Sequence, residues 1–269
     1  MRDARRRNRN IGTGKSGYGA NNRLRIPDRW SDLSIYWERL ESFVSVRKRV
    51  HQRPITFLVE PPRTGYRHHC TVQDVAHALE LLPRDHVAPI DLIVFRQPTV
   101  KQGILAPVWG RLAYWSDIGE HEGPGIYLEA QPVDLVLKWG KSLGPDSLAE
   151  LDRHRRTGFR VEAHTRGYRI YTTPATVRAS QLYRTLPHEV GHYVDYMESQ
   201  KTLGTGEDSE RFWKLYGARA AREKEAYAHR YADDFWHEMV RRGRLPVPPG
   251  YDPDVICQDG LSPEWFAEL

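Results

Sequence analysis

The sequence HEVGH at residues 188–192 constrains the fold of this chain more than any other feature. Positions i and i+4 lie on the same face of an α-helix, so His188 and His192 can bind one cation if this segment is helical. Zinc accepts neutral imidazole nitrogens, and a catalytic zinc site has three protein ligands and leaves its fourth position to water. Glu189 would face that water, where it can act as a general base. The motif therefore predicts an amphipathic helix and a third ligand from elsewhere in the chain.

The helix predicted to follow offers candidates for the third ligand, in the sequence EKEAYAHRYA at residues 223–232. Glu225 lies 33 residues after His192, a separation that allows a second helix to turn back and pack across the first. His229 lies one turn beyond Glu225 on the same face, so it can be the ligand itself or a partner of a ligand. Glu223 cannot face the same metal as Glu225, and we interpret it as a solvated charge. Small residues that permit a close helix crossing follow in the same segment: Ala226, Ala228 and Ala232.

The predicted elements change in kind along the chain, from strands to long helices. Short apolar or β-branched runs predict strands at residues 55–60, 90–95, 110–114 and 125–129, and a hairpin at residues 159–172. Helical spacing predicts helices at residues 30–49, 71–82, 182–197 and 209–240, and a short one at residues 148–154. A strand-rich half followed by a helical half is the pattern of an α+β fold.

These changes divide the chain into four parts: a basic tail (1–25), an α/β part with the sheet (26–174), a helical core with the HEVGH motif (175–245) and a wrapping C-terminal segment (246–269). The tail holds eight Lys or Arg residues and one Asp, a net charge of +7, and because the whole chain carries +5 the remainder sums to −2. A disordered, solvated tail is the simplest interpretation. Its arginines can also make weak phosphate contacts with nucleic acid.

Several classes of protein are disfavoured by the composition. No stretch approaches the roughly 18 apolar residues of a membrane-spanning helix, so we expect no membrane association. The basic N-terminal residues are not followed by the apolar run of a secretory signal. Two cysteines, Cys70 and Cys257, are too few for a disulfide framework, which fits a reducing compartment. We therefore expect a soluble, cytoplasmic, globular protein.

Some other residues are weaker site candidates. The triplet His68-His69-Cys70 offers three metal-binding side chains, but adjacent residues point apart, and a loop cluster is the simpler interpretation. Asp195, one turn after His192, can orient an imidazole through its other ring nitrogen or can be a solvated charge. Three aromatic residues can line a cleft or pack in the core equally well: Trp109, Tyr114 and Trp115.

The run HEVGHYVD at residues 188–195, followed by EAYA at residues 225–228, resembles the zincin metallopeptidases of the gluzincin kind. In these proteins a HExxH helix is joined by a glutamate from a later helix. The run is also similar to lethal-factor-like peptidases and to the ImmA/IrrE group of bacterial and phage regulators. The resemblance covers roughly residues 180–236. It implies a zincin-like α+β fold, in which a mixed sheet packs over the HExxH helix and an edge strand lines the cleft.

By this resemblance His188, His192 and Glu225 would be zinc ligands, and Glu189 would be the catalytic base. The activity implied is that of a zinc metalloendopeptidase that hydrolyses a protein or peptide substrate. Lethal-factor-like peptidases also use a tyrosine upstream of the ligand glutamate to stabilise the oxyanion. Tyr216 lies near that position, although its spacing to the glutamate differs from theirs.

Two functions of other classes compete with this one. The first is a non-catalytic metal-binding interaction protein, in which the metal site is structural. The second is a nucleic-acid-associated regulator that uses residues 1–25, a role that is compatible with peptidase activity. The presence of Glu189 between the two histidines argues against the first alternative, because a structural metal site does not need a base.

Overall fold

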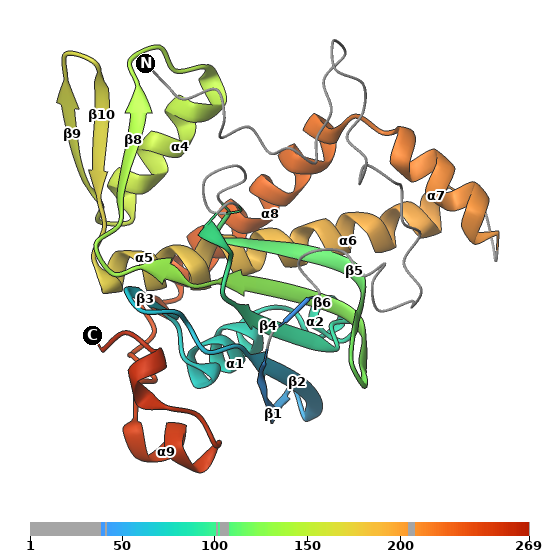
Figure 1. Ribbon diagram of the computed structural model, residues 1–269. Coiled ribbons are helices and arrows are strands. Elements are labelled where there is room, and N and C mark those ends of the chain that lie inside the picture. The colour runs from blue at the N-terminus through green and yellow to red at the C-terminus, as the bar shows by residue number, and fades with distance from the viewer. Residues whose placement is uncertain (1–38, 41, 101, 103–107, 204–207, 269) are drawn as a thin grey trace, which may run out of the picture. The chain divides into compact units, whose positions relative to one another are not determined.

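A computed structural model of the chain describes residues 39–40, 42–100, 102, 108–203 and 208–268 (Figure 1). All of them lie within the unit Trp37–Leu269. The basic tail predicted for residues 1–25 and the first part of the helix predicted for residues 30–49 lie outside this description. Among the described helices, none combines the length and the apolar character that crossing a membrane requires.

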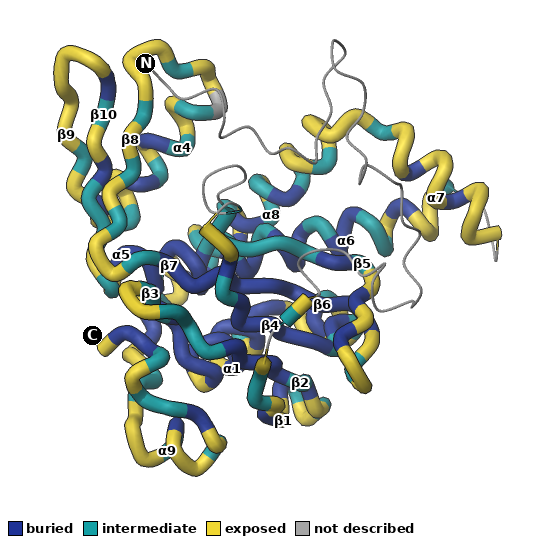
Figure 2. The backbone as a smooth tube through the Cα atoms, in the orientation of Figure 1, coloured by how far each residue is buried: buried dark blue, intermediate teal, exposed yellow. Residues whose placement is uncertain are grey.

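The main sheet has five strands in the order β1-β2-β4-β6-β5. Its central strands β2 (Arg53–Val59), β4 (Leu92–Arg96) and β6 (His121–Glu129) are parallel, whereas the edge strands β1 (Val44–Val50) and β5 (Gly110–Ile118) are antiparallel to their neighbours. Figure 2 shows that the central strands are largely buried, which explains their continuous apolar runs. Strands are confirmed, with shifted ends, where the sequence predicted them: residues 55–60, 90–95, 110–114 and 125–129.

The helix predicted for residues 30–49 is wrong over its last residues, which form strand β1. The sequence VSVRKRV alternates along this strand, with Val46 and Val50 buried, which is the period of a strand and not of a helix. A two-residue turn joins β1 to β2, and both of its residues, His51 and Gln52, have positive φ angles of 50° and 68°. This is the conformation of a type I′ hairpin turn. Neither residue is Gly or Asn, so the usual turn signal is missing from the sequence.

The helices that form the core cover one face of the sheet. Helices α1 (Val72–Glu80) and α6 (Leu186–Thr202) pack there, and α8 (Ala221–Arg241) packs against α6. The largest hydrophobic cluster includes residues of all three helices and of the strands. In β2, Phe57 and Val59 belong to this cluster, while Leu58 between them belongs to a smaller cluster on the opposite face. The fold is therefore α+β with a mixed sheet and several helices, as predicted.

The helical segment that leads into the motif contains a π turn. Helix α5 (Pro174–Ser180) continues through the π turn η3 (Gln181–Thr185) into α6, where the backbone N–H of Leu186 donates to the carbonyl of Gln181. Pro187 has no N–H, and its ring crowds the carbonyl of the preceding turn, so a wider turn at this point relieves the conflict. The helix predicted for residues 182–197 is confirmed, and it runs further in both directions.

The single helix predicted for residues 209–240 is wrong, because the structure divides it into α7 (Ser209–Ala218) and α8. Arg219 and Ala220 between them are extended, with ψ angles of 139° and 132°. The turn directs the Arg219 guanidinium onto Asp195 of α6, with Nη1 3.1 and 3.0 Å from the two carboxylate oxygens. A tertiary ion pair therefore accompanies the break in the helix.

A small second sheet with its own helix precedes the helical half. It contains β8 (Val136–Gly140), β9 (Arg160–His164) and β10 (Gly167–Tyr171) in the order β8-β10-β9, with helix α4 (Pro145–Arg156). Its core consists of Leu151, Phe159 and Ile170. The hairpin predicted at residues 159–172 and the helix predicted at residues 148–154 are confirmed. The remaining elements are β3 (Tyr66–Arg67), α2 (Arg84–Val87), β7 (Gln131–Pro132), α9 (Pro253–Gln258) and the 3₁₀ turn η4 (Pro263–Trp265).

A buried ion pair holds the C-terminal segment against the helices. Arg178 of α5 and Asp74 of α1 are 2.6 Å apart and both are almost inaccessible to solvent. The Arg178 guanidinium also donates to the carbonyls of Val247 and Pro248, and Asp74 accepts from the N–H of Gly250. Each charge is therefore paired and hydrogen-bonded, as burial requires.

We expect the buried His68 to make the protein less stable in mild acid. Burial, opposed by the hydrogen bond to the Glu60 carbonyl, lowers the pKa of His68 from 6.5 to about 4. Between these values the unfolded chain binds the proton that the folded chain does not, so the free energy of unfolding falls as the pH is lowered. Between pH 7 and pH 5, the protonation of His68 alone should lower the free energy of unfolding by about 2 kcal/mol.

The measurement is urea unfolding of wild type and His68→Gln at both pH values, with metal removed. The glutamine amide can still donate to the Glu60 carbonyl. The difference between the two proteins cancels the contributions of other titrating groups, so the variant should lose about 2 kcal/mol less than wild type on acidification. Equal losses in the two proteins would contradict the assignment.

Candidate metal centre

Helix α6 presents the three polar residues of the motif toward one cavity. His188, Glu189 and His192 all line it, together with residues of β5 and of the first turns of α8. The Nε2 atoms of His188 and His192 lie 3.1 Å apart, with the two ring planes nearly perpendicular. One helix therefore supplies two imidazole nitrogens that face the same point.

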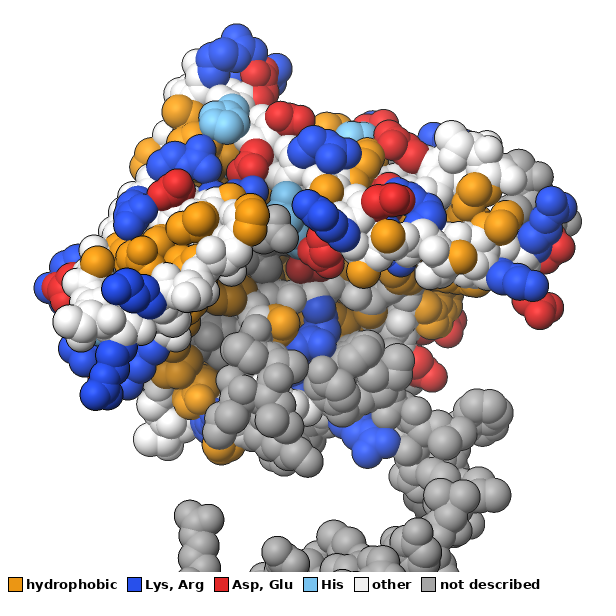
Figure 3. All heavy atoms as spheres, turned by 90° about the horizontal axis from the view of Figure 1, so that it is seen from above, with side chains coloured by type: hydrophobic (Ala, Val, Ile, Leu, Met, Phe, Trp, Pro, Cys, Tyr) orange, Lys and Arg blue, Asp and Glu red, His pale blue; other side chains and the backbone are white. Residues whose placement is uncertain are grey.

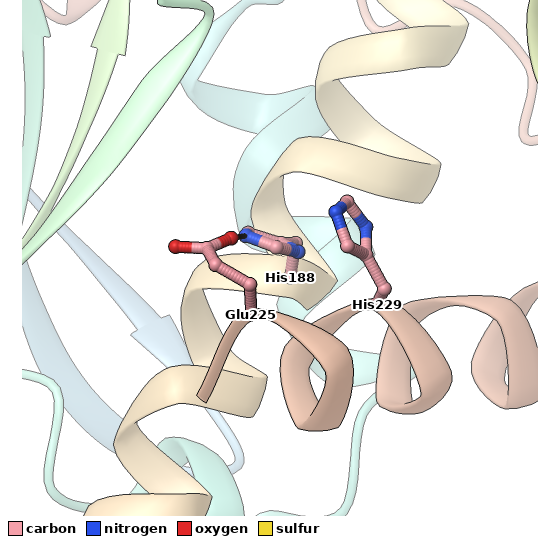
Figure 4. Close-up of side chains that lie close together, drawn as sticks. All are labelled: His188, Glu225 and His229. Carbon is pink, nitrogen blue, oxygen red and sulfur yellow. Dashed lines mark ion pairs between the residues drawn. The ribbon is translucent and has the colours of Figure 1, made fainter. Parts of the chain in front are cut away.

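The crossing of α8 over α6 brings a carboxylate to this point. A Cβ atom at Gly191 would lie 3.0 Å from Cβ of Tyr231 and 3.2 Å from Cα of Ala228, so the crossing depends on a residue without a side chain. Glu225, one turn before Ala228, places its Oε2 3.4 Å from Nε2 of His188 and its Oε1 3.6 Å from Nε2 of His192. Figure 4 shows Glu225 and His229 projecting from α8 toward His188.

The separations between these atoms suit a tetrahedral metal ion. Two ligand atoms about 2.1 Å from a tetrahedral ion lie about 3.4 Å apart. The observed separations are 3.1 Å between the two imidazole nitrogens, 3.4 Å from His188 to Oε2 of Glu225 and 3.6 Å from His192 to Oε1 of Glu225. Two neutral imidazoles and one carboxylate are also a donor set that zinc accepts. His188, His192 and Glu225 therefore form a donor set that a divalent ion could bind.

His229, the rival candidate for the third ligand, lies in the same cluster. Its ring centroid is 4.6 Å from that of His188, and single ligand atoms of His188, Glu225 and His229 lie within 4.8 Å of one another. Burial and the neighbouring His188 lower the pKa of His229, so its imidazole is neutral near pH 7 and able to bind a metal. Glu225 and His229 therefore both remain candidates for the third ligand beside His188. Glu223 is exposed and does not line the cavity.

The environment of Glu189 suits proton transfer. Its side chain is buried, and burial raises its pKa from 4.5 to about 7, although His188 and a backbone hydrogen bond from Leu112 oppose the shift. A carboxyl group with a pKa near the working pH can both accept a proton and return it. Because this shift describes the site before any cation binds, a nearby divalent ion would lower the pKa again.

Asp195 and Tyr216, two residues whose roles the sequence left open, contact each other. The Asp195 carboxylate pairs with Arg219 and accepts from the Tyr216 hydroxyl at 3.1 Å, so it does not orient an imidazole. The hydroxyl oxygens of Tyr216 and Tyr114 lie 2.9 Å apart. Because Tyr216 uses its only hydroxyl hydrogen to donate to Asp195, Tyr114 must be the donor in the bond between the two tyrosines. Tyr216 is buried and does not line the cavity, so an oxyanion role for it is not supported.

Strand β5 forms one wall of the cavity, a role that sequence reasoning could not assign to any strand. The cavity has a volume of about 510 Å³ and includes Gly110, Arg111, Leu112 and Tyr114 of this strand. On its other side β5 has no paired strand among the described residues. The three aromatic candidates therefore have different positions. Tyr114 lines the cavity, Trp115 is 60% exposed, and Trp109 packs against Phe159.

The second group of possible metal ligands, His68-His69-Cys70, is structural. All three residues are buried, and His68 donates to the carbonyl of Glu60. The Cys70 sulfur lies 3.6 Å from the Gln181 side-chain oxygen, and burial raises the pKa of its thiol. Within the described part of the chain these three residues do not form a cluster of ligand atoms. The interpretation as a packed loop is therefore the better one.

A side chain at Gly191 should weaken metal binding by separating the two helices. We expect Gly191→Val to raise the zinc dissociation constant at least tenfold, because the crossing must open to admit the side chain. The overpacking should also lower the free energy of unfolding by about 2 kcal/mol. Competition with a chromogenic chelator measures the first quantity, and urea unfolding of the apoprotein measures the second.

Gly217→Val is the matched control for this prediction. Gly217 also lies in a helix, α7, but a Cβ atom there would have no neighbour within 4 Å. The control therefore reports the helix-propensity cost of valine without the steric conflict. Equal zinc affinities of the two variants would show that the close crossing does not position Glu225.

Comparisons of the chain with protein-family models, with curated proteins and with solved structures found no match.

Proposed function

We propose that this protein is a zinc-dependent metalloendopeptidase with a zincin-like arrangement of sheet and helices. The observation that carries the proposal is the set of separations between the His188 and His192 nitrogens and the Glu225 carboxylate, 3.1 to 3.6 Å. Glu189 lies beside them in the same cavity. Two imidazoles, a carboxylate and a buried base in one cavity are the groups that metal-assisted hydrolysis requires.

Each residue has a separate role in this proposal. His188, His192 and Glu225 would hold the ion, which supplies positive charge that polarises a carbonyl group and acidifies water. Glu189 accepts the proton of the attacking water and returns it to the leaving amine. Its burial supports this role, because a carboxyl group shielded from water holds a proton more readily than an exposed one.

The unpaired edge of β5 supports a peptide as the substrate. An extended peptide can bind to a free strand edge through main-chain hydrogen bonds, which need no particular side chains. β5 lines the cavity. It lies beside the motif helix α6, which contacts both β5 and β6 (Figure 1). A peptide added to this edge would bring a carbonyl group to the histidines of α6. The free thiols of Cys70 and Cys257 support a cytoplasmic location as a further part of the proposal.

Metal analysis and a cleavage assay test the proposal together. We expect wild type to retain about one zinc ion per chain and His188→Ala to retain almost none, since one of three protein ligands is lost. Zinc-loaded wild type should cleave members of a mixed peptide library, a chelator should stop the cleavage, and added zinc should restore it. Stoichiometric zinc without cleavage of any peptide would favour the non-catalytic alternative.

A further inference from the structure

A second cavity adjoins the first and shares Glu225 with it. It has a volume of about 730 Å³ and lies between the small sheet with its helix and α8. Its lining includes Trp139, Glu150, Arg153, Arg222, Ala226 and His229. Because one residue borders both cavities, a peptide bound along β5 in the first can place a side chain in the second.

Most of the charged groups around the second cavity neutralise one another. Arg153 lies 3.0 Å from Glu150 and 3.2 Å from Asp233, and Arg184 approaches the same two carboxylates at 3.6 and 4.0 Å. Two guanidinium groups therefore face two carboxylates in one network. This network adds no net charge to the cavity, and each of its four members is already in an ion pair.

Arg222 is the exception. It lies in the first turn of α8, is exposed, and forms no ion pair with any residue that the structure describes. The Glu225 carboxylate faces the two α6 imidazoles and would be shared with the metal. On the face shown in Figure 3, Lys and Arg side chains lie close to Asp and Glu side chains, with a His side chain visible between them.

We infer that this second cavity is a substrate subsite for an acidic side chain, Asp or Glu, close to the scissile bond, and that Arg222 is its partner. The inference extends the proposed function, since it names the class of substrate for the same site. A guanidinium group binds a carboxylate through two parallel hydrogen bonds, and it repels Lys and Arg at the same position. Trp139 and Ala226 supply apolar surface for the methylene groups of the bound side chain.

Binding selection tests this inference without requiring catalysis. The zinc-loaded Glu189→Gln protein is immobilised and incubated with a degenerate peptide library, and the captured peptides are sequenced by mass spectrometry. We expect Asp and Glu to be enriched about tenfold over Asn and Gln at one position of the captured peptides. This is the gain in affinity expected from one charge-assisted hydrogen bond. Adding Arg222→Gln should remove the enrichment. Adding Arg230→Gln instead should preserve it, because Arg230 is an exposed arginine of the same helix that lines neither cavity.

The possible outcomes separate the subsite from the proposed function. Capture without acidic enrichment, or enrichment that persists in the Arg222→Gln protein, overturns the subsite. If wild type cleaves peptides that show no acidic preference, the subsite is wrong and the peptidase proposal stands. If acidic peptides are captured through Arg222 but wild type cleaves none of them, the peptidase proposal is wrong and the subsite stands.

Discussion

Replacing Glu189 with glutamine should abolish peptide hydrolysis while leaving zinc bound. Glutamine has nearly the same shape as glutamate, and residue 189 is not one of the three groups that would hold the ion. It cannot accept a proton from water at neutral pH, so the rate should fall by about a thousandfold, the typical contribution of a general base. Metal content, thermal unfolding and cleavage of a library-derived peptide measure the three properties on one preparation.

Glu198→Gln provides the control, because it makes the same chemical change on the same helix. Glu198 is exposed and accepts a hydrogen bond from the Tyr227 hydroxyl, away from the cavity. We expect this variant to keep both zinc and activity. Near-normal hydrolysis by Glu189→Gln would exclude Glu189 as the base, whereas loss of zinc from it would point to a structural role for the side chain.

The parts of the site that a single helix fixes could be predicted from the sequence. His188 and His192 must face the same way once residues 188–192 are helical, since the i, i+4 relation is local. The α+β class followed from strand and helix patterns in the same local way. Glu225 was a weaker prediction, because its place depends on how α8 crosses α6. The two helices approach each other closely at Gly191, and the distance between two helices cannot be predicted from a sequence pattern.

Predictions from the sequence were wrong where long-range contacts determine the local structure. The strand β1 depends on a hairpin turn at His51 and Gln52 that carries no turn-forming residue. The break between α7 and α8 accompanies the ion pair of Arg219 with Asp195, whose partners lie 24 residues apart. The role of Tyr216, which the sequence left open, also depends on Asp195, because the buried Tyr216 hydroxyl donates to its carboxylate. The role of β5 as the cavity wall depends on the strand order, which no single segment encodes.

Removing the Glu225 carboxylate should weaken zinc binding far more than removing the His229 imidazole. If three ligands share a binding free energy of about 12 kcal/mol, the loss of one costs roughly 4 kcal/mol, or about a thousandfold in affinity. Glu225→Ala should show this loss, and His229→Ala should show about tenfold, the lower end of the effect of a neighbouring group that only supports a ligand. Chelator competition measures both affinities.

The comparison is informative because both side chains are accessible enough to be removed from the folded protein. The Glu225 side chain is 55% exposed, and His229 is half-buried in the neighbouring cavity. Neither substitution leaves a large void, so urea unfolding of the two apoproteins should give similar free energies, and the affinities can be compared directly. Cobalt substitution adds a second measurement, since its visible absorption reports the number of ligands. A larger loss of affinity in His229→Ala would make His229 the third ligand, and Glu225 would then belong to the substrate cleft.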